Sequence, residues 1–213
     1  MDLAQQLALW ADKLRDVSAL GLRFASNPYD TEHFRVVQDI AMGMLALATD
    51  ESLEQMEPLR APIFDRPTPF AVGDAAVIDD AGQILLIRRA DNGLWAMPGG
   101  ALEVGETPAE GVEREALEET GVPCQAVALV GVFDSRLCGS VPRHHLYHIQ
   151  FLCKPLDRPR VEATHAHEVL DAQWFARESL PQDMDPGHVS RIPEAFRIWD
   201  GRGQAYFDRG EQA

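Results

Sequence analysis

An acidic segment at residues 100–122 holds the side chains of this chain that are best suited to chemistry. It reads GALEVGETPAEGVEREALEETGV, opening at a double glycine and closing at a glycine. In a helix over residues 107–120, at about 100° per residue, Glu115, Glu118 and Glu119 fall within roughly 100° of arc. Like charges this close repel one another, so the trio predicts a divalent-cation site. Oxygen ligands without nearby sulfur favour Mg²⁺ or Mn²⁺ over zinc.

The rest of the expected helix divides into two faces. Ala109, Val112 and Ala116 lie on the neighbouring arc and should face the core, while Glu110 and Glu113 point toward solvent. The alternative is that the glutamates form only a solvated acidic face. The glycines and the arginine that flank them favour the metal site.

The segment also fills every fixed position of the Nudix box: Gly, five residues, Glu106, seven residues, then REALEETGV over residues 114–122. Ala116 stands where a larger aliphatic residue is usual, but alanine still packs there. The chain therefore resembles the Nudix hydrolases. The resemblance implies an α/β/α sandwich with a mixed β-sheet, hydrolysis of phosphoanhydrides, and a loop braced by hydrogen bonds from Glu106.

Roles for the other box residues follow from the same resemblance. Glu115 and Glu119 are implied as the principal metal ligands, and Glu118 joins them directly or through water. The main-chain carbonyl of Gly99 is implied as a further ligand. Arg114 is expected to orient the carboxylates, as part of an i,i+4 pair with Glu118.

The expected reaction is attack of water on phosphorus without a covalent enzyme intermediate. Family members take the general base from the box helix or from a later loop. Glu168, in the sequence HAHE just before a predicted strand, is the leading loop candidate, and Glu162 is the second. The alternative for Glu168 is a solvated loop carboxylate.

Regions outside the box are similar to a Nudix subgroup that acts on nucleoside diphosphates linked to another moiety, X. They lie at residues 21–24, 27–30, 133–136 and 144–147. The implied substrates are of the ADP-ribose or CDP-choline type, and the products are a nucleoside monophosphate and phospho-X. One alternative is a house-cleaning nucleoside triphosphate hydrolase or an RNA 5′-end pyrophosphohydrolase. Another is a non-catalytic nucleotide sensor with a Nudix fold.

Several arginines are candidates for holding substrate phosphate through their forked donors. They are Arg88 or its neighbour Arg89 near a strand end, Arg136 and Arg143. A surface salt bridge is the alternative for each. The histidines lack HExxH or CxxC partners, so we interpret four of them as loop residues rather than metal ligands: His144, His145, His165 and His167.

The chain is expected to contain an N-terminal helical hairpin (residues 1–55), an extended proline-rich linker (56–69) and a catalytic domain (70–205). Apolar residues spaced 4-3-4-3 mark the first helix: Leu3, Leu7, Trp10, Leu14 and Val17. Two helices alone bury too little surface to be stable. The hairpin should therefore pack on the main domain or on a second subunit, and we predict a homodimer. The last dozen residues are polar and expected to fray.

Composition excludes some classes of function. The net charge of -15 over 213 residues argues against nucleic-acid binding as a main activity. The sequence contains no run of 18 apolar residues, so we expect no membrane-spanning helix. Three scattered cysteines fit a reducing compartment, so the cytoplasm is the expected location.

Overall fold

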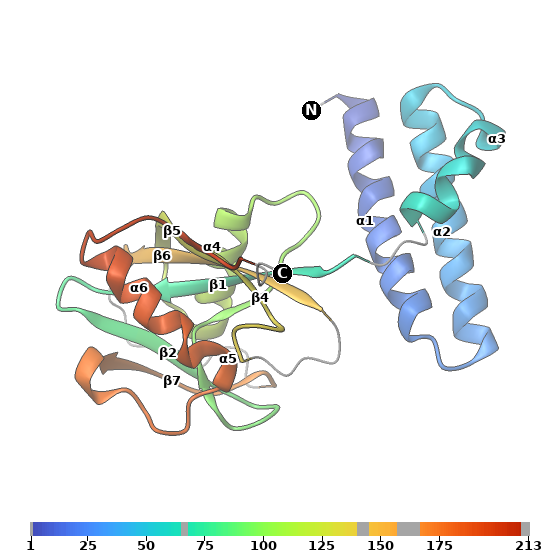
Figure 1. Cartoon of the computed structure of the whole chain (residues 1–213). Coiled ribbons are helices and arrows are strands. Elements are labelled where there is room, and N and C mark those ends of the chain that lie inside the picture. The colour runs from blue at the N-terminus through green and yellow to red at the C-terminus, as the bar shows by residue number, and fades with distance from the viewer. Residues whose placement is uncertain (1, 65–67, 140–144, 157–166, 210–213) are drawn as a thin grey trace. The chain divides into compact units, whose positions relative to one another are not determined.

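A computed structural model describes residues 2–64, 68–139, 145–156 and 167–209 of the chain. The chain forms two compact units, Met1–Thr68 and Pro69–Ala213. Figure 1 labels most of the helices and strands of both. Each unit is described below by itself.

The first unit is built on two antiparallel helices, α1 (Leu3–Phe24) and α2 (Pro28–Thr49). Small buried residues of α1, such as Ala11 and Ser18, let the helices approach closely. Larger apolar residues of α1 remain on the outside: Leu3, Trp10, Val17 and Phe24. The predicted hairpin is thus present, but much of its apolar stripe is exposed.

Helical turns replace much of the expected extended linker. After α2 come α3 (Leu53–Met56), a 3₁₀ turn (Glu57–Leu59) and a single π-helical turn (Arg60–Phe64). Phe64 is only 1% exposed and belongs to the core of this unit. Burial of this side chain holds the turns against the hairpin, so the expectation of an extended chain is wrong up to residue 64.

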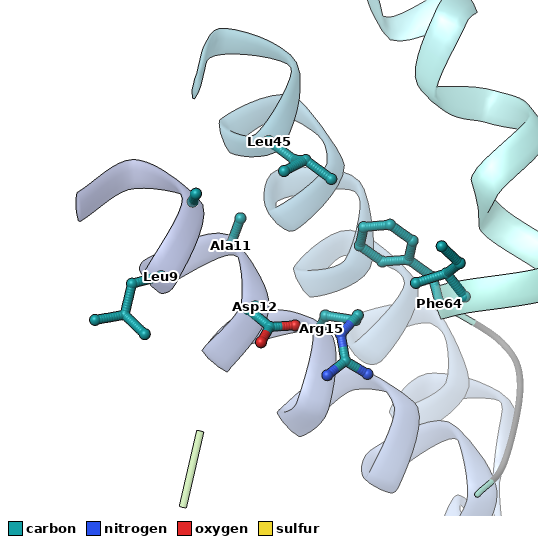
Figure 2. Close-up of a pocket in the computed structure, with 8 residues that line it drawn as sticks. Leu9, Ala11, Asp12, Arg15, Leu45 and Phe64 are labelled. Carbon is teal, nitrogen blue, oxygen red and sulfur yellow. Dashed lines mark hydrogen bonds and ion pairs between the residues drawn. The ribbon is translucent and has the colours of Figure 1, made fainter. Parts of the chain in front are cut away.

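A pocket of about 380 Å³ lies between the helices of this unit and its last turn. Figure 2 shows residues that line it, which include Leu9, Leu45 and Phe64. Asp12 and Arg15 also line the pocket, and they form an ion pair with 2.6 Å between Oδ1 and Nε. The pocket is therefore mostly apolar, with its charges paired.

The second unit contains two β-sheets, a five-stranded sheet ordered β4-β1-β6-β5-β8 and a three-stranded sheet ordered β3-β2-β7. The pairs β1–β6 and β5–β8 are parallel, and the other pairs are antiparallel. The predicted mixed sheet is confirmed. The strands are β1 (Phe70–Val77), β2 (Gln83–Arg89), β3 (Trp95–Ala96), β4 (Gly99–Ala101), β5 (Cys124–Asp134), β6 (Leu146–Pro155), β7 (Val169–Ala176) and β8 (Tyr206–Phe207).

Helices cover both faces of the larger sheet. Because side chains alternate along a strand, Ala75 of β1 packs with Val112 on one face, while Ala76 packs with Ile192 on the other. The first face carries the acidic helix, and the second carries the C-terminal helix. This arrangement confirms the expected α/β/α layering. The helices of this unit are α4 (Pro108–Thr120), a 3₁₀ turn (Arg177–Ser179), α5 (Pro186–Val189) and α6 (Arg191–Trp199).

The C-terminal residues are more ordered than expected. β8 pairs in parallel with Gly131 and Val132 of β5. The ring of Tyr206 stacks on that of Phe133 with 4.8 Å between centroids. The expectation that the last dozen residues fray is therefore wrong as far as residue 207.

Two compositional predictions can be compared with the structure. Cys124, Cys138 and Cys153 are buried free thiols. Within the described part of the chain, no helix has both the length and the apolar character that a membrane crossing requires.

Candidate active site

The ends of α4 are fixed by residues that the sequence places there. The Thr107 hydroxyl accepts a hydrogen bond from the Glu110 N–H, and the Glu110 carboxylate accepts one from the Thr107 N–H. Pro108 occupies the first turn, and Gly121 ends the helix in the left-handed region at φ 69°. The predicted helix is confirmed, and its boundaries set the direction in which each glutamate points.

The double glycine before the helix brings main chain against the acidic side chains. The Gly99 N–H donates to Glu119 Oε2 over 2.8 Å. A Cβ at Gly99 would lie 2.2 Å from the Gly73 carbonyl oxygen, and one at Gly100 would lie 2.6 Å from Glu115 Oε1. Gly99 therefore has no room for a side chain, and a side chain at Gly100 would displace the Glu115 carboxylate, so the two glycines let the loop lie directly on the glutamates.

Glu119 is the most deeply placed acid of the box, with 6% of its surface exposed. Burial above all, together with the negative charges of Glu115 and Glu168, raises the pKa of its carboxyl to about 8, against the opposing effects of the Gly99 N–H and of Arg89. Its Oε2 accepts from the Gly99 N–H over 2.8 Å. A cation bound to this carboxylate would offset the cost of burying its charge.

Arg114 holds the remaining acids of the box. Its guanidinium donates to both oxygens of Glu106, over 3.1 and 2.9 Å, and to Glu115 and Glu118 over 2.9 and 3.1 Å. These bonds, that to Glu106 above all, raise the pKa of the arginine. Glu106 also accepts from the Glu103 N–H over 2.7 Å. The predicted bracing of the loop by Glu106 is therefore confirmed.

The predicted metal ligands do not converge on one point in this geometry. The described residues contain no group of three or more His, Cys, Asp or Glu side chains close enough to hold a metal ion. The reason is that Arg114 attracts Glu115 and Glu118, while Glu119 accepts from the loop. The donor set nevertheless fits a hard divalent cation, because it is made of oxygens. Burial also raises the pKa of Glu115, and the charge of Glu168 adds to this, so a cation here would relieve repulsion among carboxylates.

Glu113 has a different place from the one expected. Its carboxylate accepts a hydrogen bond from the Ala126 N–H over 2.8 Å and ties α4 to β5. The prediction that it points to solvent is wrong, because the adjacent strand offers an unpaired main-chain donor. Glu110 is exposed, as expected.

Glu168 lies beside the box although 49 positions separate it from Glu119 in the sequence. It directly precedes β7, and its carbonyl accepts from the Ala90 N–H over 2.8 Å, just after β2. Its side chain is 56% exposed, and His167 Nε2 lies 3.5 Å from its Oε1. The carboxylate is close enough to raise the pKa of two box glutamates. Glu162 lies outside the described residues.

The two neighbouring arginines of β2 have different surroundings. Arg88 Nε donates to the Gly93 carbonyl over 2.9 Å. Arg89 pairs with Asp91 over 2.7 Å, and its charge lowers the pKa of Glu119. Of the two, Arg89 is therefore the arginine whose charge acts on the acidic site.

Arg136 follows the end of β5 and donates to the Asp134 carboxylate through Nε and Nη2. His145 Nε2 lies 3.1 Å from the same carboxylate. Among the described residues, Arg136 has no hydrogen bond or ion pair with the glutamates of α4. Three further candidates lie outside the described residues: Arg143, His144 and His165.

A buried polar network behind the loop was not predicted from the sequence. Asp74 of β1 accepts from Arg191 Nη1 and pairs with His148 Nδ1, all three side chains being 8% exposed or less. His188 Nδ1 accepts from the Met97 N–H over 3.2 Å. The one signal in the sequence is a charged residue inside the apolar strand FAVGDAAV.

Comparison with known proteins shows which families the chain matches. Residues 68–195 match the family described as the NUDIX domain. The chain belongs to the Nudix hydrolase family. Residues 5–59 of this Nudix hydrolase match a second family, described as a UDP-X-like, N-terminal oligomerisation domain.

Individual relatives share much of this Nudix hydrolase. A protein of Bacillus subtilis (strain 168) named "Putative ADP-ribose pyrophosphatase YjhB" is 32% identical over 80% of this chain and 81% of its own length. A "MutT-like protein" of Streptomyces ambofaciens is 37% identical over 60% of this chain and 75% of its own. The crystal structure of a UDP-X diphosphatase matches 96% of this chain and 99% of its own, with a TM-score of 0.60 and 26% identity.

Proposed function

We propose that this Nudix hydrolase cleaves the pyrophosphate bond of a nucleoside diphosphate linked to X, with Mg²⁺ or Mn²⁺. The products would be a nucleoside monophosphate and phospho-X. The main support is the buried Glu119 carboxylate, held 2.8 Å from the Gly99 N–H in a box that keeps all its glutamates. Relatives named for ADP-ribose and UDP-X substrates support the choice of substrate class. A non-catalytic sensor would not need this set of carboxylates.

Several residues of the box would hold the cation together. Glu119 and Glu115 would be the principal ligands, with Glu118 and the Gly99 carbonyl completing the set. Arg114 keeps two of these carboxylates beside the loop through its bonds of 2.9 and 3.1 Å. Bound divalent cations would neutralise part of the pyrophosphate charge and lower the pKa of a bound water.

Two residues from outside the box complete the proposal. Glu168 would accept the proton of the attacking water, since its carboxylate lies beside the box and is 56% exposed to solvent. Arg89 would bind a substrate phosphate, because its positive charge faces Glu119. Arg88, Arg136 and Arg143 remain candidates for contacts with more distant parts of the substrate.

The test is a substrate panel with identified products. The full chain would be incubated with Mg²⁺ or Mn²⁺ and ADP-ribose, UDP-glucose, CDP-choline or a deoxynucleoside triphosphate. A nucleoside monophosphate with phospho-X supports the proposal. Pyrophosphate released from the triphosphate supports the house-cleaning alternative, and tight binding without turnover supports a sensor.

We also propose that the N-terminal hairpin (residues 1–55) joins two copies of the chain, while residues 70–205 carry the catalysis and residues 56–69 connect the two. The support is an apolar row at intervals of seven on α1, all exposed by 48% or more: Leu3, Trp10, Val17 and Phe24. Such a row suits packing against another helix. The family description of this region as an oligomerisation domain points the same way. The free thiols agree with the cytoplasm as the proposed location.

A further inference from the structure

The buried network behind the glycine loop has an energetic peculiarity. Arg191 is fully buried, with 0% of its side chain exposed, and pairs with Asp74 at 4%. Its Nη2 and the Oε1 of Gln150 have no hydrogen-bond partner in the described part of the chain. Apolar residues of similar volume often replace buried ion pairs without loss of stability. Stability alone therefore does not explain this network. Its directional hydrogen bonds could instead orient the neighbouring loop.

The network is connected to the loop through main-chain bonds. The Asp74 backbone is paired in register with Gly99 of β4, and the Ala75 N–H donates to the Pro98 carbonyl over 2.8 Å. Any shift of Asp74 would thus move Gly99. On the C-terminal side, Arg191 Nε donates to the Gly187 carbonyl over 2.6 Å.

A second connection reaches the same loop from α5. His188 Nδ1 accepts from the Met97 N–H, two residues before Gly99. The Trp95 N–H donates to the Asp183 carbonyl, and the Asp185 N–H donates to the Trp95 carbonyl, over 2.9 and 2.8 Å. The strand that leads into the loop is therefore held by the segment just before Arg191.

We propose that Arg191 is a positioning residue for the hydrolytic reaction. Through Asp74, and through the turn that carries His188, it fixes residues 97–99 so that the Gly99 N–H meets Glu119. The inference rests on the proposed function, because it assumes that Gly99 and Glu119 belong to the reaction centre. Arg191 itself is too deeply buried to touch substrate.

The first test removes both charges of the pair. The double variant Asp74→Asn/Arg191→Met leaves no uncompensated buried ion. We expect kcat to fall about 10- to 100-fold, as it does when groups that orient metal ligands are removed, with KM within about twofold. Without added metal, exchange of the Gly99 amide hydrogen, followed by ¹H–¹⁵N NMR, should become at least about tenfold faster because its bond to Glu119 is loosened.

The matched control is Ile192→Ala. Ile192 is the next residue of α6 and is 1% exposed in the core, but it is an apolar residue with no part in the polar network. Its loss should lower the thermal midpoint while leaving kcat and the Gly99 exchange rate within about twofold of wild type. A purely structural role for Arg191 would give the double variant the same behaviour, and that result would overturn the inference.

A pair of milder variants decides the question if the double variant does not fold. In His188→Asn the side-chain oxygen can replace Nδ1 as acceptor for the Met97 N–H, so kcat and Gly99 exchange should stay near wild type. In His188→Leu the acceptor is lost, and both should change in the direction given above. Equal values for the two variants would contradict the proposal. If wild type itself hydrolyses no substrate of the panel, the proposed function fails instead.

Discussion

At the scale of single residues, the glutamates of the box have different partners and therefore different roles. Glu119 accepts from the loop, Glu106 anchors Arg114, and Glu113 caps a neighbouring strand. The family resemblance predicts that Glu106 braces the loop, and the helical spacing places Glu119 with the other acids of the site. Neither predicts the role of Glu113, because its partner, the Ala126 N–H, belongs to a strand whose position only the fold determines.

Arg114 should be sensitive even to a conservative change. Its planar guanidinium bonds Glu106, Glu115 and Glu118 at once, and a lysine ammonium cannot reproduce this fork. We expect Arg114→Lys to lower kcat and Mn²⁺ affinity by about 10- to 100-fold. Steady-state kinetics and electron paramagnetic resonance of free Mn²⁺ would measure the two effects. As a control, Arg177→Lys changes an arginine paired with Asp200 elsewhere in the unit, and equal losses in both variants would contradict this prediction.

The two arginines of β2 should differ in their effect on substrate binding. Arg89→Gln is expected to raise KM by about tenfold or more, because a charged hydrogen bond to phosphate contributes about 1.5–3 kcal/mol. Arg88→Gln should have a smaller effect, since its Nε bonds the Gly93 carbonyl. Initial rates against substrate concentration measure both. A larger rise for Arg88→Gln would reverse the assignment.

At the scale of elements, the structure shows which parts the sequence could predict. Helix α4 could be predicted to within one residue, because Thr107, Pro108 and Gly121 are local signals. β8 could not, since two residues in a polar tail carry no periodicity. The pairing of Asp74 with Arg191 spans 117 positions and follows no spacing rule. The turns over residues 53–64 depend on burial of Phe64, which outweighs the tendency of proline-rich chain to extend.

His188 should make stability depend on pH. Burial lowers its pKa to about 3, and the charge of Arg191 adds to this effect. The unfolded chain takes up a proton below its pKa of about 6.5, whereas the folded chain does not until about pH 3. Stability is therefore lost as the pH falls through this window. The charged or titratable groups around the ring are Asp74, His148, Asp185 and Arg191.

The measurement compares wild type with His188→Asn, which cannot titrate. Urea unfolding between pH 7 and 5 should show wild type losing about 2 kcal/mol more than the variant. An equal loss in the two proteins would mean that His188 is protonated as readily in the folded chain as in the unfolded one.

At the scale of the whole molecule, the two units carry different features. The unit Pro69–Ala213 contains the described residues of the acidic site, and the unit Met1–Thr68 carries the exposed apolar row. Sequence periodicity could predict a hairpin that needs a partner. It could not decide which residues pack within the hairpin, because small residues such as Ala11 and Ser18 form the helix contact and leave Trp10 outside.

The proposed homodimer leads to a direct prediction. Light scattering after size exclusion should give twice the chain mass of 23.6 kDa. Trp10→Glu/Val17→Glu places charge in the apolar row and should give the single-chain mass, because burying unpaired charge is costly. Asp16→Lys, a charge change at an exposed position about 100° around the same helix from Val17, should leave the dimer intact. A monomeric wild type would refute the proposed assembly.

The most direct test of the central claim compares two glutamates of one helix. Wild type, Glu119→Gln and Glu110→Gln would be assayed with Mg²⁺ on the nucleoside diphosphate-X that wild type cleaves fastest, with products identified by ³¹P NMR. Glu110 is exposed at the helix start, and glutamine preserves its cap, so we expect this variant to keep wild-type activity. Glu119→Gln should lose about 10³-fold or more in kcat with its fold intact. Wild-type turnover by Glu119→Gln would contradict the assignment of the buried carboxylate to the reaction.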